Sequence, residues 1–332
     1  MGDFRRVVWW RSRAAITKMK RFKILSIDGG GIKGVFPAAF LAALEEDLKI
    51  RIGEYFDLIA GTSTGGIIAL ALGLGLSADA IVQFYLRKGP LIFPSSKGFF
   101  KFSWLASPSK YKSANLQAAL ADVFDKRLLG DSSSRLFIPS FDANTGLIHI
   151  YKTAHHERLR RDYRCTAVEV GMATSAAPVY FPSYKSDRDI TLIDGGIWAN
   201  NPSGLAVVEA ISMLNAPPDQ IDVLSLGCTE IPPDFLQTRK WFGYWPLKLL
   251  DAMFRGQSFS SLGTAQHLVG HGNVHRVNPT VAPGQYKLDR TKGIEDLRGL
   301  AYQTARYASP KLATVFFSKP AERFTPIYQS NS

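Results

Sequence analysis

Cysteine is scarce in this chain: only two occur among its 332 residues, Cys165 and Cys228. Two cysteines cannot build a disulfide framework, and neither of them lies in the spacing of a metal site. We therefore expect no metal site, and we expect both cysteines to be buried small apolar side chains in a protein of a reducing compartment.

Long hydrophobic runs are also missing. The longest apolar stretch covers residues 67–76, whereas a membrane-spanning helix needs about 20 predominantly apolar residues. The chain has no internal repeat, and no linker rich in glycine, serine and proline divides it. Since 46% of its residues are apolar, the chain can bury one large core, and we expect a single domain.

Acidic residues are nearly absent from the first 23 positions, which carry eight lysines and arginines against Asp3 alone. This segment supplies +7 of the formal net charge of +12, so that the other 309 residues carry only +5. Because the excess charge belongs to a tail, the composition argues against a nucleic-acid polymer as partner of the folded body. We expect residues 1–20 to be a disordered basic extension, although Trp9 and Trp10 would also suit anionic lipid, and residues 21–332 to form the domain.

Apolar segments of strand length alternate with segments of helical character. Predicted strands cover residues 22–27, 56–60, 136–141, 147–152, 191–193 and 222–226, and predicted helices cover 35–48, 66–74, 113–124, 166–177, 202–214 and 294–307. Ser113 is the expected N-cap of its helix. The alternation predicts an α/β fold in which helices cover both faces of a mostly parallel central sheet. Sites in such sheets lie beyond the carboxyl ends of the strands.

Two glycine-rich segments follow the first two predicted strands, and each opens a predicted helix. They are Asp28-Gly29-Gly30-Gly31-Ile32-Lys33-Gly34 and Gly61-Thr62-Ser63-Thr64-Gly65. A serine between glycines at a strand-to-helix turn has its hydroxyl lifted clear of the backbone for attack. Glycines at a helix start offer backbone N–H groups to an anion. A nucleophile beside an anion site can cleave an ester through an acyl-enzyme.

The first glycine loop also fits a second template. Gly29, Gly31 and Gly34 match the G-x-G-x-x-G pattern of dinucleotide-binding folds. That interpretation requires an acidic residue at the end of the next strand to bind the ribose, but the next strand ends in the serine turn. A phosphate loop of the G-x-x-x-x-G-K-[ST] type is absent, because Lys33 precedes Gly34. The sequence therefore favours the anion site of an ester-cleaving enzyme over a dinucleotide cofactor.

Ser63 needs a base to accept its proton. Asp194 follows a predicted strand and precedes Gly195 and Gly196, which would free its carboxylate to reach a neighbouring loop. In a Ser-Asp dyad this carboxylate accepts the proton directly.

A triad, in which a histidine stands between the two groups, is the alternative. Its imidazole could come from His267, His271 or His275. Residues 266–271 look helical rather than loop-like, which favours the dyad, but both arrangements fit the sequence. His155 and His156 lie in a charged stretch, and we expect both at the solvated surface.

These motifs, in this order, resemble those of the patatin-like phospholipases. Residues 173–182 (Ala-Thr-Ser-Ala-Ala-Pro-Val-Tyr-Phe-Pro) and 200–202 (Asn-Asn-Pro) extend the resemblance, which runs from about residue 22 to at least residue 227. It implies a single patatin-like domain and a lipid acyl hydrolase that cleaves fatty-acyl esters of membrane glycerophospholipids. It also implies that catalysis needs no metal or organic cofactor.

The resemblance further implies roles for single residues. Ser63 would be the nucleophile and Asp194 the base of a dyad, and the N–H groups of Gly30 and Gly31 would form the oxyanion hole. The matching motif positions are Gly29, Gly31, Lys33 and Gly34 in the glycine loop, Gly61 and Gly65 in the nucleophile elbow, and Asp194, Gly195 and Gly196 in the Asp-Gly-Gly motif. Many members have arginine in place of Lys33, so that the charge is kept here but the planar fork is lost.

More narrowly, residues 22–34 and the size of the chain resemble bacterial patatin-like effectors of anti-phage (CBASS) systems. This resemblance implies activation by a cyclic dinucleotide and a cytoplasmic enzyme that contacts the inner face of the membrane. The expected partners are the phospholipid substrate, a cyclic dinucleotide as effector and, in a homodimer, a second copy of the chain. The nucleotide phosphates could meet Arg158, Arg160, Arg161 and Arg164, with Trp241 or Tyr244 stacking on a base, although a solvated charged turn is the simpler interpretation.

Membrane contact has a candidate in residues 97–104, where aromatic and basic side chains suit the headgroup region. Two alternatives to the phospholipase remain open from the sequence. One is a general soluble carboxylesterase with a Ser-Asp-His triad, and the other is a non-catalytic lipid- or nucleotide-sensing module on the same scaffold.

Overall fold

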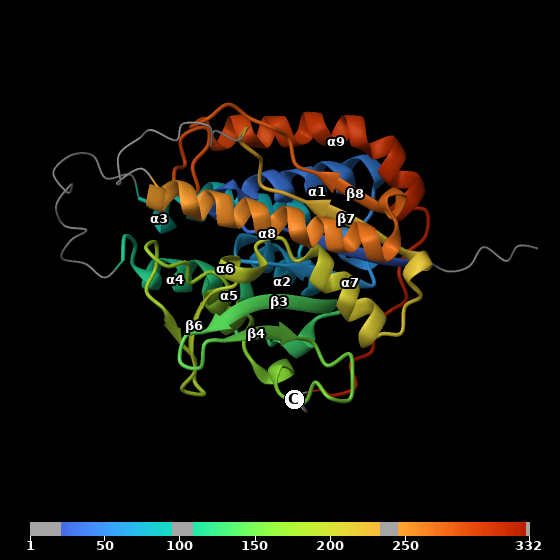
Figure 1. Cartoon of the computed structure of the whole chain (residues 1–332), viewed down its shortest axis with the longest axis horizontal. Helices are drawn as coiled ribbons and strands as arrows, with labels where there is room; N and C mark the ends of the chain where they lie inside the picture. The colour runs from blue at the N-terminus through green and yellow to red at the C-terminus, as the bar shows by residue number, and fades with distance from the viewer. Residues whose placement is uncertain (1–20, 95–108, 233–244, 330–332) are drawn as a thin grey trace, which may run out of the picture.

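The computed structural model describes residues 21–94, 109–232 and 245–329, and for residues 245–251 only the backbone. Its sheet has eight strands in the order β5-β6-β3-β2-β1-β7-β8, and β4 pairs with β3 outside this path (Figure 1). Strands β3, β2, β1, β7 and β8 run parallel, whereas β4, β5 and β6 add antiparallel pairs. The bounds are β1 Phe22–Ile27, β2 Leu58–Gly61, β3 Arg135–Asp142, β4 Leu147–Lys152, β5 Tyr184–Lys185, β6 Thr191–Asp194, β7 Ile221–Leu226 and β8 Val274–Val277.

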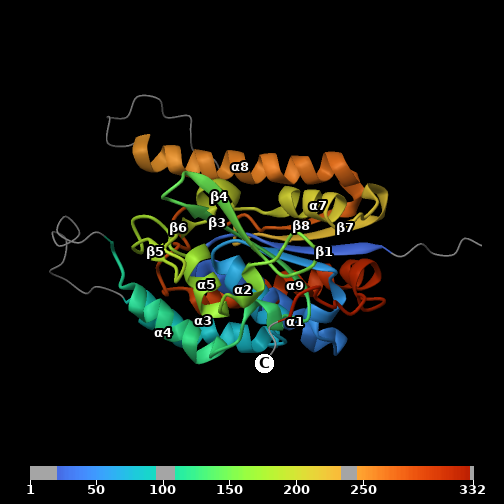
Figure 2. The same cartoon turned by 90° about the horizontal axis from the view of Figure 1, so that it is seen from below.

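Helices cover both faces of this sheet, as Figure 2 shows. Helices α7 (Ser203–Ser212) and α8 (Trp245–Val269) lie on one face. The other face is covered by α1 (Val35–Leu48), α2 (Thr64–Gly73), α3 (Ala78–Ile92), α4 (Ser113–Phe124), α5 (Ala167–Thr174) and α9 (Ile294–Phe316). The predicted α/β fold with a mostly parallel, doubly covered sheet is confirmed.

The core is unequally divided between the two faces. The larger cluster includes the fully buried Phe36 and Phe40 of α1, which lies beside α9 on the same face of the sheet. A helix that packs on two sides must be apolar nearly all round, and the first ten residues of α1 are all buried. The smaller cluster joins the sheet to Ala206 and Val207 of α7. Strand β2 and helix α2 are buried over their whole length, and β1 and α1 over most of theirs, so that the turns between them, which carry the two glycine motifs, are anchored in the core.

Several predicted elements have their expected bounds and others do not. The first strand and the first helix run over the predicted residues 22–27 and 35–48. Ser113 is not an N-cap: Lys112 occupies that position, and Ser113 is the first helical residue. Helix α9 continues to Phe316, past the predicted end at residue 307. No pattern predicted the helices α3 and α8 or the four-residue strand β8.

Burial of the two cysteines is confirmed, since Cys165 and Cys228 are both buried free thiols. The prediction of a solvated His155 is wrong. Its Nε2 lies 2.9 Å from Oε1 of Glu209, whose Oε2 accepts a 2.6 Å hydrogen bond from Nζ of Lys152. The opposite charges of Lys152 and Glu209 offset each other beneath α7, which is why part of a charged stretch can be buried. Burial lowers the pKa of His155.

Some predictions fall on residues outside the described ranges. They concern the basic extension of residues 1–20, the membrane-contact segment 97–104, and Trp241 and Tyr244. Among the helices that the structure describes, none is long and apolar enough to cross a membrane.

Candidate active site

Ser63 stands in the sharp turn between β2 and α2, with the backbone angles φ 55° and ψ −122°. A side chain other than glycine pays on the order of 1–3 kcal/mol for such a conformation, which persists only where the surroundings enforce it. The two flanking glycines make the turn sterically feasible. A Cβ on Gly61 would overlap the carbonyl oxygen of Gly65. A Cβ on Gly65 would lie 2.8 Å from the carbonyl oxygen of Asp28. This is the nucleophile-elbow geometry that the sequence predicted.

Neighbouring threonines hold this turn. The N–H of Ser63 donates to Oγ1 of Thr174 over 3.0 Å, and the hydroxyl of Thr174 donates to the carbonyl of Pro139 over 2.6 Å. The hydroxyl of Thr62 donates to the carbonyl of Ala199 over 2.5 Å. The orientation of Ser63 is thus set by contacts with the last residue of α5, with β3, and with the last residue of the short helix α6 (Gly196–Ala199).

Asp194 lies at the end of β6 with its carboxylate directed at the serine. Its Oδ2 accepts a hydrogen bond from the hydroxyl of Ser63 over 2.7 Å, and its Oδ1 accepts one from the N–H of Gly196 over 2.6 Å. Gly195 allows the chain to turn there, because a Cβ would overlap the carbonyl of Pro139. Burial raises the pKa of Asp194 to about 6, against the lowering effect of its two hydrogen bonds. The carboxylate can therefore both ionise and accept a proton near neutral pH.

The glycine loop passes beside the serine. A Cβ on Gly29 would lie 3.4 Å from Cβ of Ser63 and would overlap the side chain of Asn200. The N–H of Gly29 is already used, since it donates to the carbonyl of Asn200 over 2.9 Å. Within the described ranges, no group accepts a hydrogen bond from the N–H of Gly30 or Gly31. The loop thus brings two donors to the nucleophile's side of the site.

The remaining motif residues also lie here. Gly34 is the N-cap of α1, and a Cβ on it would lie 2.8 Å from the hydroxyl of Tyr85. Lys33 lies in the 3-10 turn η1 (Gly31–Gly34) with its Nζ 3.5 Å from Oγ1 of Thr229. The structure therefore brings the glycine loop, the elbow and the Asp-Gly-Gly motif together beyond the carboxyl ends of the central strands β1 and β2.

The candidate histidines are engaged elsewhere. His267 lies in the last turn of α8, edge-to-face with His271 at a centroid separation of 6.2 Å. His275 is on β8, where its ring packs against Phe316 at 5.4 Å. Ser63 meets Asp194 directly, so that its hydroxyl proton is already directed at a carboxylate and not at an imidazole.

The arginine cluster is a surface feature of the connection after β4. Arg158 and Arg160 are exposed, and Nε of Arg160 donates to the carbonyl of Glu157 over 3.0 Å. Nε of Arg164 donates to the hydroxyl of Tyr163 over 2.9 Å. These contacts are local, which fits the simpler interpretation of a solvated charged turn.

Sequence reasoning assigned no role to four residues that shape the site. Asn200 and Thr174 lie in the segments 200–202 and 173–182, so that the resemblance could have pointed to them. Arg276 and Leu288 contact the glycine loop from the last part of the chain. No motif marks either of them.

A strained serine that is hydrogen-bonded to a buried carboxylate, beside N–H groups without an acceptor among the described residues, is an arrangement typical of serine hydrolases. Comparison with known proteins agrees with this class. The family model for patatin-like phospholipases matches residues 25–207. The chain belongs to the patatin-like phospholipase family, whose members are ester hydrolases.

Several curated proteins are similar over most of the chain. A cGAMP-activated phospholipase of Vibrio cholerae is 31% identical over 91% of this chain and 96% of its own length. A cGAMP-activated phospholipase of Escherichia coli is 29% identical over 92% and 95%. Patatin-like protein 4 of Arabidopsis thaliana is 33% identical, but over only 58% of this chain and 54% of its own. The bacterial similarity therefore includes the last third of the chain, beyond the family model.

Among solved structures, VipD from Legionella pneumophila matches with a TM-score of 0.50 at 12% identity, over 90% of this chain and 67% of its own. At this identity the match bears on the fold alone.

Proposed function

We propose that this protein is a lipid acyl hydrolase that cleaves fatty-acyl esters of membrane glycerophospholipids by a Ser-Asp dyad. The observation that carries the proposal is the direct 2.7 Å hydrogen bond from Ser63 to Oδ2 of Asp194. The family membership supports the ester as the bond that is cleaved.

The reaction begins with attack of Oγ of Ser63 on the ester carbonyl, while Asp194 takes the hydroxyl proton. The carbonyl oxygen becomes an oxyanion and accepts hydrogen bonds from the N–H groups of Gly30 and Gly31, at the positive end of α1. Collapse of this intermediate expels the lysophospholipid alkoxide, which takes the proton from Asp194. Water then attacks the acyl-serine, gives a proton to Asp194 and releases the fatty acid as Ser63 regains its proton.

The dyad is favoured over the triad by the same contact. A histidine base would have to stand between serine and carboxylate, where the 2.7 Å separation leaves no room for an imidazole. A non-catalytic module is disfavoured by the strained φ of Ser63, because strain of this kind is retained at reacting positions.

Exposed apolar side chains that suit a lipid surface lie close to the motifs of the site. Leu288 (38% exposed) contacts the glycine loop, and Ile197 (37%) follows the Asp-Gly-Gly motif. Val179 is 72% exposed, and its carbonyl accepts the N–H of Lys110, whose Nζ pairs with Asp289 beside Leu288. Apolar residues beside lysine favour insertion at an anionic interface. This arrangement supports an enzyme that works at the membrane surface, and we assign it to the cytoplasmic side.

Activation by a cyclic dinucleotide is supported by the relatives. Three similar bacterial proteins are described as cGAMP-activated phospholipases, and two of them are similar over more than nine-tenths of this chain. Similarity that continues through the last third of the chain is what a shared regulatory site requires. We therefore propose cyclic GMP–AMP or a related cyclic dinucleotide as the activator, in a role in anti-phage defence.

The test is mass spectrometry of lipid products from phospholipid vesicles, with and without cyclic GMP–AMP. Free fatty acid and lysophospholipid should appear, more strongly with the nucleotide. Turnover of short nitrophenyl esters but not of vesicles would instead identify a general carboxylesterase. Absence of turnover, together with no labelling of Ser63 by a fluorophosphonate, would leave a sensing module.

A further inference from the structure

The glycine loop is held at both of its ends by the last part of the chain. Asp28 directly follows the last residue of β1 and is the first residue of the glycine loop, and its side chain is buried. At the other end, the N–H of Ile32 donates to the carbonyl of Leu288 over 2.8 Å. Both partners lie outside the residues that the family model matches.

The guanidinium of Arg276, on β8, donates two parallel hydrogen bonds to the carboxylate of Asp28. Its Nη1 lies 2.9 Å from Oδ1 and its Nη2 lies 2.5 Å from Oδ2. Nη1 also donates to Oγ of Ser225 over 2.8 Å. The pair is largely removed from water, with side-chain exposures of 18% for Arg276 and 6% for Asp28. A bidentate guanidinium–carboxylate pair restrains orientation as well as position.

Between these two anchors lie Gly29, Gly30 and Gly31, which include both proposed oxyanion donors. Gly31 has φ +57°, a conformation that favours glycine, and its backbone packs so tightly against the carbonyl of Leu288 that a Cβ would overlap it. Gly30 packs against Cys228, with a Cβ on it falling 2.6 Å from the thiol sulfur. Three glycines in a row have little stiffness of their own, so that the direction of their N–H groups depends on the anchors.

We propose that Arg276 is a positioning residue: through Asp28 it holds the N–H groups of Gly30 and Gly31 in the direction that an oxyanion requires. The inference rests on the proposed function. Loss of the pair should act on the transition state and not on substrate binding, since the donors meet the oxyanion only as it forms. A misplacement of about 1 Å in such a site can cost on the order of 10²-fold in rate.

The chain contains a matched control. Arg21 and Asp222 form a second Arg–Asp pair, with Nη2 of Arg21 2.7 Å from Oδ1 of Asp222. This pair lies at the other end of β1 from the glycine loop. It joins Arg21, just before β1, to Asp222 near the start of β7. Arg21→Gln therefore removes an Arg–Asp pair from the same parallel part of the sheet without touching the glycine loop.

The experiment compares Arg276→Gln, Arg276→Lys and Arg21→Gln in the full chain. We expect Arg276→Gln to lower kcat by about 10- to 100-fold, with an unchanged KM, and Arg276→Lys to recover part of the loss because a single ammonium keeps the charge without the fork. Arg21→Gln should keep the wild-type kcat. If Arg276→Gln does not fold, Arg276→Lys carries the test. Wild-type kcat in a folded Arg276 variant would overturn the proposal, as would an equal loss in Arg21→Gln.

Hydrogen exchange of the unliganded protein provides a readout that does not depend on turnover. The peptide spanning residues 28–34 should exchange faster in the Arg276 variants, while the peptide spanning residues 61–65 should not change. If the wild type hydrolyses no ester and Ser63 is not labelled, the proposed function fails, but the exchange result still decides whether Arg276 holds the loop. Unchanged exchange in both peptides would refute the positioning role.

Discussion

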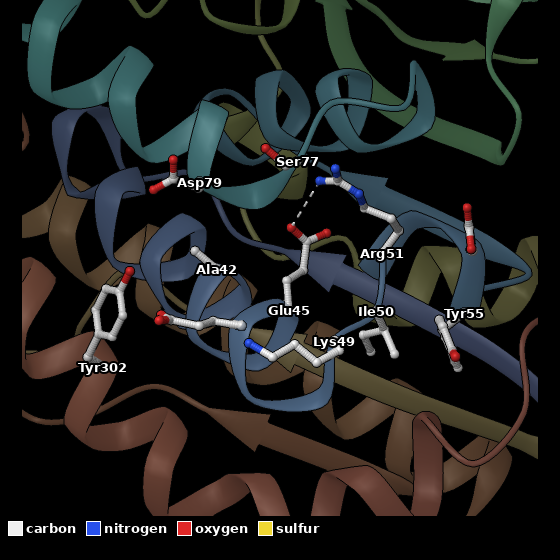
Figure 3. A pocket seen from close by; sticks show the side chains of 11 residues that line it. Ala42, Glu45, Lys49, Ile50, Arg51, Tyr55, Ser77, Asp79 and Tyr302 are labelled. Carbon is white, nitrogen blue, oxygen red and sulfur yellow. Dashed lines mark ion pairs between the residues drawn. The ribbon is translucent and has the colours of Figure 1, made fainter.

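The two ends of helix α1 carry very different sites. At its first residue the glycine loop, Ser63 and Asp194 meet in a tightly packed arrangement. At its last turn lies an open groove of about 770 Å³ (Figure 3). The groove is lined by charged and polar side chains, among them Glu45, Glu46, Glu54, Asp79, Lys49 and Arg51.

One acidic residue of the groove, Glu45, serves the fold. Its Oε1 accepts the N–H of Ile52 over 2.9 Å, and its Oε2 accepts that of Ala78 over 2.8 Å, at the start of α3. Arg51 approaches the same carboxylate at 3.8 Å. Volume alone therefore does not identify the reacting site. The candidate residues gather where the parallel strands β1 and β2 end beside the starts of helices, which provide N–H groups, and where the antiparallel strand β6 brings Asp194 to Ser63.

Paired serine substitutions should separate the two ends most sharply. Ser63→Ala removes the proposed nucleophile and should lower kcat on the order of 10⁵-fold or more. Ser77→Ala removes the N-cap of α3 at the groove, where its oxygen accepts the N–H of Ala80, and should cost about 1 kcal/mol of stability with no loss of rate. Vesicle hydrolysis and thermal melts measure both. Equal activity of the two variants would remove the distinction.

Asp194→Asn should lower kcat by about 10²- to 10⁴-fold, the usual contribution of a general base. Asp79→Asn in the groove is the control and should keep the wild-type rate. In the wild type, kcat/KM should fall about tenfold per pH unit below 6, because the base must be ionised and burial raises the pKa of Asp194 to about 6.

Stability should respond to Asp194 with the opposite sign. Its pKa is higher in the folded protein than in the unfolded chain, so that the protonated carboxyl stabilises the fold below about pH 4 and this contribution is lost as the pH rises through 6. The melting temperature of Asp194→Asn should therefore exceed that of the wild type at pH 7.5. A lower melting temperature there would contradict the shifted pKa.

Glycine substitutions should have the next largest effect. Gly30→Ala would drive a methyl group into Cys228 and displace a proposed oxyanion donor, at a cost of about 10²- to 10³-fold in kcat. Gly299→Ala, on the face of α9 near Tyr302 of the groove, meets nothing within 4 Å and should stabilise the helix by roughly 0.5–1 kcal/mol. Cys228→Gly combined with Gly30→Ala should restore part of the rate, and a failure to do so would argue against the steric cause.

Substitutions of the groove itself should change least. Tyr302→Phe alters a half-buried position of its lining and Lys49→Ala an exposed one, and we expect vesicle hydrolysis to stay within about twofold of the wild type. The comparison should be repeated with cyclic GMP–AMP present. A loss of nucleotide activation in either variant would make the groove a regulatory site and would revise the contrast drawn above.

Local patterns were sufficient for much of the site. Ser63 and Asp194 could be found because each needs glycines within two residues, and those glycines are visible in the sequence. The bounds of β1 and α1 could be read because an apolar strand and a mostly buried helix differ clearly in length and spacing. His155 could not be placed in this way, since only its contact with Glu209, 54 residues away, makes burial of a charged stretch tolerable.

The amino-acid sequence by itself determined the strands and helices that flank the two glycine motifs, and the two turns that present the serine and the glycine N–H groups, because turns and short periodic segments obey local steric rules. Tertiary structure alone decided that the carboxylate meets the hydroxyl without an imidazole, and that Arg276 reaches Asp28 across 248 positions. A sequence pattern records spacing along the chain, whereas the distance between remote side chains follows from how strands are ordered in the sheet.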